Sequence, residues 1–359
     1  MKKAAGRAKG VFILRDCPKL PTCGKAKMCR TVIFVKFSNS GSEPNQQYDI
    51  IGDVHGQAGE LETLLEKLGW TYTNPVWHHR YKKAVFVGDL IDRGPEQRRV
   101  LRIVRNMHRE GLAEVVAGNH EYNAVCYATK NPKIEGEYLR KRTGPKGEVH
   151  TKQHLRFLQE FPEGGREYTE AIEWFKTLPL WFETEGLRVV HACWDQDSIE
   201  FLRHNTTPMR DQDWLISSSD ETSIEHIAVE NLLKGPEIKL PETLWYLDKD
   251  GHERKKARYA WWNNKAGSLR EVISVPSGTK TINGSDFNPS DEDYEVPVKQ
   301  YDDSKLVVVG HYWRTGRLEV LSRKIVCVDY SAGNGGPLVA YRYQGEEETS
   351  NDNFTSSRA

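Results

Sequence analysis

The first third of the chain alternates short apolar stretches with longer amphipathic ones. The apolar stretches cover residues 48–51, 84–87 and 112–117, and the helix-like runs Glu60–Leu68 and Glu96–His108 separate them. Short, largely apolar runs rich in β-branched residues are typical of buried parallel strands. Because strands that alternate with helices form βαβ units, the pattern predicts an α/β fold. The carboxyl ends of the three strands should then meet at one edge of a parallel sheet.

Each of these stretches ends in glycine and ligand-type side chains. The sequences that follow the strands are Gly52-Asp53-Val54-His55-Gly56, Gly88-Asp89-Leu90-Ile91-Asp92-Arg93-Gly94-Pro95 and Gly118-Asn119-His120-Glu121. In open α/β sheets ligands bind outside the carboxyl ends of the strands. A solvated turn is the common alternative for any single Asp at such a position. Three occurrences in this order favour a site that holds cations and a phosphate.

The second half of the chain predicts a further set of strands around two histidines. His191 ends one strand, which pairs with its predecessor across a turn at Glu185-Gly186, and His311 follows another strand directly. The sequence predicts strands at Trp181–Glu183, Leu187–His191, Lys305–Val309, 325–329 and 338–343.

The segments between these elements are more polar. Residues 122–170 predict helical hairpins or loops over the sheet, and Glu170–Thr177 and Ile224–Leu233 predict helices. Gly251–Trp262 combines basic and aromatic side chains, and the residues from there to 300, rich in Ser, Asn, Asp and Pro, predict an exposed loop.

We therefore expect one main domain over residues 45–345, with 195–300 as an insertion or cap. Residues 1–44 are basic and carry Cys17, Cys23 and Cys29 at a spacing that matches no zinc pattern. This extension is expected to be poorly ordered, with a nucleic-acid-binding arm as the alternative. Residues 346–359 are acidic, then rich in Ser and Asn, and are expected to form a disordered tail.

Composition narrows the class of protein. The 359 residues contain 51 basic and 51 acidic side chains, so bulk charge gives no reason to expect nucleic acid as a partner. No apolar run approaches the length of a membrane span, which argues against a membrane partner. Six cysteines without paired spacing suit the reducing cytoplasm.

Taken together, the motifs resemble those of the calcineurin-like metallophosphoesterases, in particular the phosphoprotein-phosphatase branch that includes bacterial diadenosine-tetraphosphatase-like enzymes. The resemblance rests on GDVHG at Gly52–Gly56, GDLIDRGP at Gly88–Pro95, GNHE at Gly118–Glu121, VVHA at Val189–Ala192 and VVGHYW at Val308–Trp313. It implies two mixed β-sheets sandwiched between helices, with inserted loops and helices over the cleft. The long segment between His191 and His311, and GHYW in place of GH-x-Pro, depart from the usual pattern.

By this resemblance the chain should bind two divalent metal ions. Asp53, His55 and Asp89 would hold the first, and Asp89 would bridge to a second held by Asn119, His191 and His311. A set that mixes Asp, Asn and His suits manganese, which we expect, and also iron or zinc. A structural, hydrogen-bonded histidine is the alternative for any one imidazole.

The resemblance also assigns roles in the chemistry. His120 would protonate the leaving oxygen, Asp92 would orient His120, and Arg93 would bind the phosphate with its bidentate fork. A second phosphate-binding arginine is expected between the two metal-ligating histidines, with Arg254 and Arg258 as candidates. Trp194 and Trp313 could stack on an aromatic part of the substrate, with core or rim packing as the alternative.

The expected function is hydrolysis of phosphate esters by direct attack of a metal-bridging hydroxide. A protein serine/threonine phosphatase-like enzyme is the first expectation, and a hydrolase of dinucleoside polyphosphates or other nucleotides is the alternative. An inactive binding protein on the same fold would have lost ligands, and all six candidate ligand positions carry ligand-type side chains here.

Overall fold

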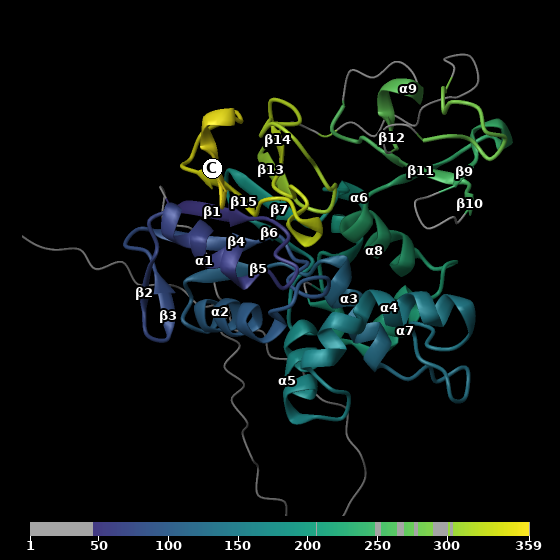
Figure 1. Cartoon of the computed structure of the whole chain (residues 1–359), viewed down its shortest axis with the longest axis horizontal. Helices are drawn as coiled ribbons and strands as arrows, with labels where there is room; N and C mark the ends of the chain where they lie inside the picture. Colours follow the sequence, from purple (N-terminus) through teal and green to yellow (C-terminus); the bar gives the residue numbers. More distant parts are fainter. Residues whose placement is uncertain are drawn as a thin grey trace, which may run out of the picture. The chain divides into compact units, whose positions relative to one another are not determined.

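Two mixed β-sheets form the centre of the fold (Figure 1). The computed structural model describes residues 46–205, 207–247, 253–263, 269–275, 279–289, 301 and 304–358. The first sheet has the order β16-β15-β1-β4-β5 and the second β14-β13-β7-β6. Their strands are β1 (Gln47–Ile51), β4 (Lys82–Phe86), β5 (Ala113–Val115), β15 (Val339–Tyr343) and β16 (Phe354–Ser356), and β6 (Trp181–Glu183), β7 (Leu187–Val190), β13 (Leu306–Val309) and β14 (Ile325–Cys327).

Parallel pairing follows the predicted βαβ order. β1 pairs in parallel with β4 and β4 with β5, while β13 lies parallel to both β7 and β14. The antiparallel strands β15 and β6 make each sheet mixed. The α/β architecture with two mixed sheets predicted from the sequence is therefore confirmed.

Alternate residues of the strands fill the space between the two sheets. One buried cluster joins Ile50 and Val85 of the first sheet to Val189 and Val308 of the second. The next residue along β1, Ile51, belongs to the other cluster, which lies under the helices. Strand residues that are apolar on both faces explain the continuous apolar runs in the sequence.

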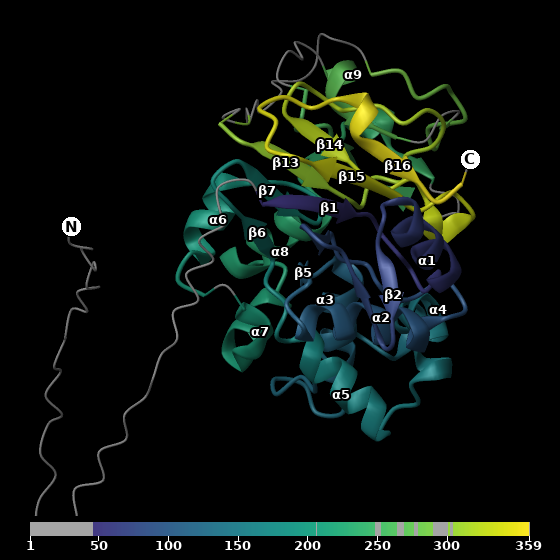
Figure 2. The ribbon, with the colours of Figure 1, turned by 90° about the vertical axis from the view of Figure 1, so that its left-hand side faces the viewer.

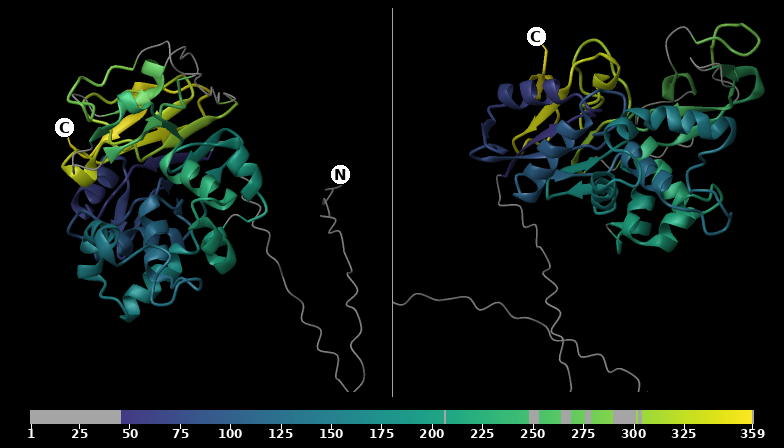
Figure 3. Two further views of the ribbon diagram at one scale, coloured as in Figure 1. Left: turned by 90° about the vertical axis from the view of Figure 1, so that its right-hand side faces the viewer. Right: turned by 60° about the horizontal axis from the view of Figure 1, so that its bottom comes forward.

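Helices cover the outer face of the first sheet. They gather on one side of the strands drawn in yellow (Figure 3). They are α1 (Ala58–Lys67), α2 (Gln97–Arg109), α3 (Asn119–Ala128), α4 (Gly144–Glu160) and α5 (Arg166–Phe175). α2 buries Val100, Leu101, Val104 and Met107 against the core and leaves its arginines outward. This division is what an amphipathic helix requires.

The segment between β7 and β13 carries a series of short helices and strands. They are α6 (Gln196–Leu202), η1 (Pro208–Arg210), α7 (Gln212–Ser218), α8 (Ile224–Lys234), β8 (Glu237–Lys239), η2 (Glu242–Leu244), β9 (Tyr246–Leu247), β10 (Glu253–Arg254), β11 (Lys256–Tyr259), α9 (Leu269–Val272) and β12 (Ile273–Ser274). β8, β11 and β12 form a small sheet. The predicted helix at Ile224–Leu233 is confirmed. The expected loop after Trp262 is wrong where β12 pairs with β11, and residues 264–268, 276–278 and 290–300 lie outside the described residues.

Hydrogen bonds tie this segment to the residues beside the two strand-end histidines. The backbone N–H of Ala192 donates to the carbonyl of Leu232 at 2.9 Å. The indole N–H of Trp261 contacts the carbonyl of Ala192 at 3.2 Å and the hydroxyl of Tyr312 at 2.9 Å. The segment therefore lies next to both His191 and His311. Two further hairpin strands, β2 (Thr71–Thr73) and β3 (Val76–His78), pair with each other beyond α1.

The expectation of a disordered tail from residue 346 is wrong. After η4 (Asn351–Asn353), β16 pairs with β15 as the edge of the first sheet, beside α1 (Figure 2). The Ser357 hydroxyl and the Arg358 guanidinium both bond the Glu60 carboxylate. Backbone pairing with an existing edge orders a polar segment that its composition alone would leave unfolded. The expected basic extension, residues 1–44, lies outside the described residues, and none of the described helices is long and apolar enough to cross a membrane.

Candidate active site

The polar strand ends of both sheets converge on one buried site. Asp53 and His55 follow β1, Asp89 follows β4, His191 follows β7 and His311 follows β13, and all five side chains are buried. Asn119 and His120 begin α3, directly after β5. The side chains that the sequence placed at one edge are thus brought together from segments more than 250 positions apart.

Backbone strain is concentrated in the loops of this site. The non-glycine residues with positive φ in the described part of the chain are His55, Asp89, Asp92, Arg93, His311, Trp313 and Ser331. Such conformations cost free energy and cluster where function demands a particular side-chain direction. Glu121 supports the loop, because its carboxylate accepts hydrogen bonds from the backbone N–H groups of Asp89, Leu90 and Gly118 at 2.9 Å.

Two clusters of possible metal ligands share the carboxylate of Asp89. His55, Asp89 and His120 form one cluster, and Asp89, His191 and His311 form the other. Oδ2 of Asp89 lies 3.6 Å from Nε2 of His55 and 3.4 Å from Nε2 of His191. One carboxylate between two imidazole groups is the arrangement that a pair of cations with a bridging ligand requires.

The imidazoles are oriented as metal ligands are. Nδ1 of His55 and Nδ1 of His191 each contact a backbone carbonyl at 2.8 Å, those of Ile91 and Val87. Each Nε2 is therefore directed at the Asp89 carboxylate. The hydrogen bond at Nδ1 fixes the orientation of the ring, as it does for histidines in known metal sites. The Nε2 atom of His311 is buried and has no hydrogen-bond partner within the described structure. The donor set and this unsatisfied nitrogen fit a binuclear metal centre, whose metal the geometry leaves open.

Electrostatics support the same fit. Burial, and then the charge of His120, lowers the pKa of His55 to about 3, so its imidazole is neutral as a ligand must be. Burial, and then the neighbouring carboxylate of Asp329, raises the pKa of Asp53 well above its usual value. Buried carboxylates that repel each other are stabilised by a divalent cation. Asp329, two residues after β14, was not singled out in the sequence.

The first cluster of possible ligands differs from the expected set, because it contains His120 and not Asp53. The Asp53 carboxylate accepts a hydrogen bond from the backbone N–H of His311 at 3.1 Å, and Asp53 is absent from the first cluster. His120 takes that place, with Nε2 3.8 Å from Oδ2 of Asp89. A metal ligand and a proton donor to a metal-held phosphate both require such proximity, and the metal content of a His120 variant separates the two roles.

Asp92 lies between two histidines. Its Oδ2 contacts Nδ1 of His120, and its Oδ1 lies 2.9 Å from Nδ1 of His154 on α4. Gln97 fixes the loop by accepting from the backbone N–H of Asp92 at 2.8 Å and donating to the Gly94 carbonyl at 2.7 Å. Burial alone would lower the pKa of His120, but the carboxylates of Asp89 and Asp92 raise it above its usual value. The imidazole is therefore kept available as an acid.

The residues predicted to bind the substrate lie in different environments in the structure. Arg93 stacks on Trp313, with its guanidinium carbon 4.0 Å from the ring centre. Arg258 lies on β11 and, after burial, is the main charge that lowers the pKa of His311. Arg254 is exposed on β10, which pairs with β9. Trp194 is buried under Arg188, which favours core packing for that side chain.

Two further cations, which no sequence motif indicated, act on residues of the site. Arg140 interacts with the charge of Asp92, and its guanidinium bonds the amide oxygens of Asn123 and Gln153. Lys234, at the end of α8, adds to the positive potential at His311. Neither lies in a motif, and only the packing of α3, α4 and α8 around the strand ends brings them close.

Known proteins have sequences similar to that of this chain. The family model of calcineurin-like phosphoesterases matches residues 48–312. The asymmetrical bis(5'-nucleosyl)-tetraphosphatase PrpE of Halalkalibacterium halodurans is 47% identical over 160 residues, 43% of this chain and 59% of that protein. PrpE of Oceanobacillus iheyensis is 32% identical over 145 residues, 40% of this chain and 54% of that protein. The matched segments span little more than half of either relative.

Two solved structures are also similar. A protein serine/threonine phosphatase from Saccharomyces cerevisiae has 15% identity and a TM-score of 0.46, with 88% of this chain and 80% of that chain covered. A cold-active protein-tyrosine phosphatase from a Shewanella species has 17% identity and a TM-score of 0.43, with 88% and 81% covered. The match of the family model over most of the sequence identifies the family. The chain belongs to the calcineurin-like phosphoesterases, a family of metal-dependent phosphoester hydrolases.

Proposed function

We propose that this chain hydrolyses dinucleoside polyphosphates at a two-metal centre. The observation that carries the proposal is the number of cations around the strand ends. Arg93, Lys234 and Arg258 act on the site's histidines, and Arg140 acts on Asp92. A phosphomonoester offers one phosphate, for which a single guanidinium fork suffices. A chain of several phosphates offers anionic groups for the remaining cations.

Two of these cations are poorly neutralised by the protein itself. Arg140 is held by the amide oxygens of Asn123 and Gln153, and Arg258, which acts on His311, forms no ion pair with a carboxylate among the described residues. Lys234, in contrast, forms an ion pair with Glu230 on the same helix. Cations with no carboxylate in direct contact, beside a buried site, are available to an anionic ligand. The names of the PrpE relatives favour the same substrate class over the phosphoprotein substrate expected first from the sequence.

The candidate ligands of the metals are Asp53, His55, Asp89, Asn119, His191 and His311. Two divalent cations held there would stabilise the charge on the phosphoryl oxygens and lower the pKa of a water molecule. Asp89 would serve both cations, since its carboxylate belongs to both clusters. The buried carbonyl contacts of His55 and His191 keep their Nε2 atoms aimed at it.

The protein's own side chains would bind the substrate and move the proton. Arg93, whose guanidinium carbon lies over the Trp313 ring, would present its fork to the phosphate under attack. His120 donates the proton on Nε2 to the leaving oxygen, while its Nδ1 stays on Asp92. His154 fixes Asp92 from the other side. Arg140, Lys234 and Arg258 would bind the phosphates beyond the one that reacts.

A pair of arginine variants tests this proposal. Arg258→Ala should raise KM for diadenosine tetraphosphate by about tenfold, the value of one lost charge-assisted hydrogen bond. It should change turnover of p-nitrophenyl phosphate much less, because that ester has a single phosphate. Arg254→Ala removes the same charge from exposed strand β10 and is the matched control. Equal losses for both substrates in Arg258→Ala, or equal effects of the two variants, would contradict the proposed phosphate chain.

A further inference from the structure

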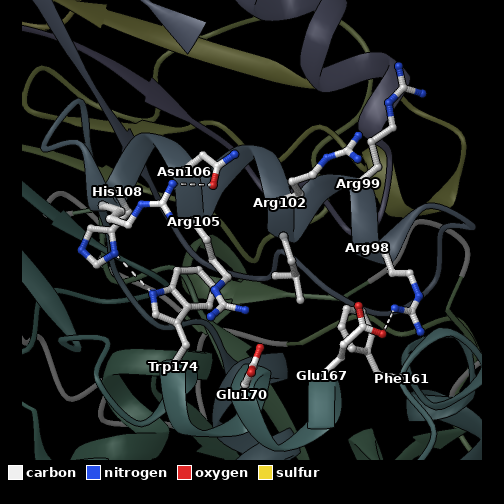
Figure 4. Close-up of a pocket in the computed structure, with 12 residues that line it drawn as sticks. Arg98, Arg99, Arg102, Arg105, Asn106, His108, Phe161, Glu167, Glu170 and Trp174 are labelled. Atoms are coloured by element: carbon white, nitrogen blue, oxygen red, sulfur yellow. Dashed lines mark hydrogen bonds and ion pairs between the residues drawn. The ribbon is translucent and has the colours of Figure 1, made fainter. Parts of the chain in front are cut away.

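A second concentration of arginine lies away from the metal centre, in a groove between α2 and α5 (Figure 4). The groove has a volume of about 670 Å³. Arg98, Arg102, Arg105 and Arg109 line it from α2, at helix positions i, i+4, i+7 and i+11. These positions form one stripe that follows the helix for about 16 Å.

Intramolecular ion pairs account for only part of this charge. Glu167 on the opposite wall pairs with Arg98, and Glu170 pairs with Arg166 outside the stripe, at 2.7 Å. Among the described residues, Arg102 forms no ion pair or hydrogen bond, and the guanidinium of Arg105 lies over the ring of Trp174. Both carboxylates of the groove therefore form their ion pairs with other arginines, Arg98 and Arg166, and Glu170 acts on Arg105 without a direct ion pair.

Trp174 gives the groove an aromatic wall beside the unpaired arginines. Its ring is half-buried, its indole N–H donates to Nδ1 of His108 at 3.3 Å, and the guanidinium carbon of Arg105 lies 5.6 Å from the ring centre. The side chain of Arg105 reaches from α2 to the Trp174 ring (Figure 4). Aromatic rings and guanidinium planes are the two surfaces on which unpaired bases stack.

We propose that the groove between α2 and α5 binds single-stranded nucleic acid. Its backbone phosphates would lie along the arginine stripe, and one base would stack against Trp174 or the Arg105 guanidinium. A row of cations spread along a helix suits a repeating anion better than a compact one, and a duplex hides its base faces from the tryptophan. Because the whole chain carries no net charge, the binding is local and sensitive to salt. The inference does not depend on the substrate proposed above.

The test compares two double variants of the full-length, metal-loaded protein. Arg102→Ala with Arg105→Ala removes the unpaired middle of the stripe. Arg317→Ala with Arg323→Ala removes the same charge from exposed arginines that pair with Glu319 and Glu348 and do not line the groove. Fluorescence anisotropy with a labelled single-stranded RNA of about ten nucleotides measures Kd across a salt series. A gel of the recovered strand confirms that it stays intact, and circular dichroism confirms that each variant is folded.

The groove variant should bind at least about tenfold more weakly than wild type, since two charge-assisted contacts are lost. The slope of log K against log salt should fall by about 1.4, the value for two phosphate contacts to a single strand. The control variant should bind within about twofold of wild type. Trp174→Phe, which keeps a ring, should bind better than Trp174→Leu.

Three results would overturn the proposal. The first is equal Kd values and salt slopes for wild type and the groove variant, which would move the contacts elsewhere, for example to the basic residues 1–44. The second is equal affinity for duplex RNA, which offers no unstacked base. The third is equally strong competition by inorganic polyphosphate at matched phosphate concentration, which would make the groove a site for phosphate chains without bases.

Discussion

Nδ1 of His154 lies 2.9 Å from Oδ1 of Asp92, on the side of that carboxylate opposite His120. His154 is buried in α4 and stacks on Phe157, with 4.9 Å between ring centres. Asp92 is therefore held from both sides, and His154 is a positioning residue for the proposed proton donor. His154→Leu should lower kcat for diadenosine tetraphosphate by about tenfold, the smaller end of the range for outer contacts.

His154→Asn provides the matched control, because its amide N–H can replace Nδ1 at Asp92. It should recover most of the lost kcat, and KM should change little in either variant. If Leu and Asn variants lose activity equally while both remain folded by circular dichroism, His154 acts through packing and the positioning role is wrong.

His120→Asn should keep both metals and slow the chemical step by about 10²- to 10⁴-fold, the usual contribution of a general acid. The loss should be smaller for p-nitrophenyl phosphate, because its leaving group needs little protonation. The test measures the metal content of the variant and its kcat for both substrates. His120 also lies in a possible ligand cluster with His55 and Asp89. Loss of one metal ion in the variant would show that it is a ligand instead.

Asp89→Asn should release metal from both positions, because the Asp89 carboxylate belongs to both clusters. Activity should fall by about 10³-fold or more, since several kcal/mol of charge stabilisation are lost. Metal content by mass spectrometry, with activity on p-nitrophenyl phosphate, measures the effect. A variant with two metals and full activity would exclude Asp89 as the shared ligand.

The C-terminal segment should contribute to stability, although its composition suggests disorder. Deleting residues 346–359 removes β16 and the contacts of Ser357 and Arg358 with Glu60. Thermal unfolding should show a loss of about 1–3 kcal/mol, within the usual range for the loss of packing and hydrogen bonds. Arg358→Ala should reproduce a smaller part of it. An unchanged Tm after the deletion would mean that the segment does not hold the edge of the sheet in solution.

The strand-end motifs could be predicted because their information is local. A glycine followed by Asp or His after a β-branched run indicates both the strand end and the ligand, so Asp89 and His311 could be predicted without knowledge of tertiary contacts. His154 and Arg140 lie in polar stretches between motifs, and only helix packing brings them to Asp92. Asp329, two residues after β14, could not be singled out either, since it has no flanking glycine or histidine.

The C-terminal strand shows the opposite error. Phe354–Ser356 is short and polar, so composition predicts disorder, but the free edge of β15 supplies backbone partners that composition does not reveal. The same holds for β11 and β12, where a basic and aromatic stretch pairs into a small sheet. Pairing between distant segments is the information that a sequence pattern lacks.

The most direct test of the account is the specificity of the metal-loaded protein. kcat/KM should be measured for diadenosine tetraphosphate, a phosphoserine peptide and p-nitrophenyl phosphate, with a chelator-treated sample as the control. The account predicts a kcat/KM for diadenosine tetraphosphate at least about a hundredfold above that for the phosphopeptide, as two or more additional charge-assisted contacts would give. The chelator should abolish both activities. A phosphopeptide hydrolysed as well as or better than diadenosine tetraphosphate would contradict the proposed substrate class.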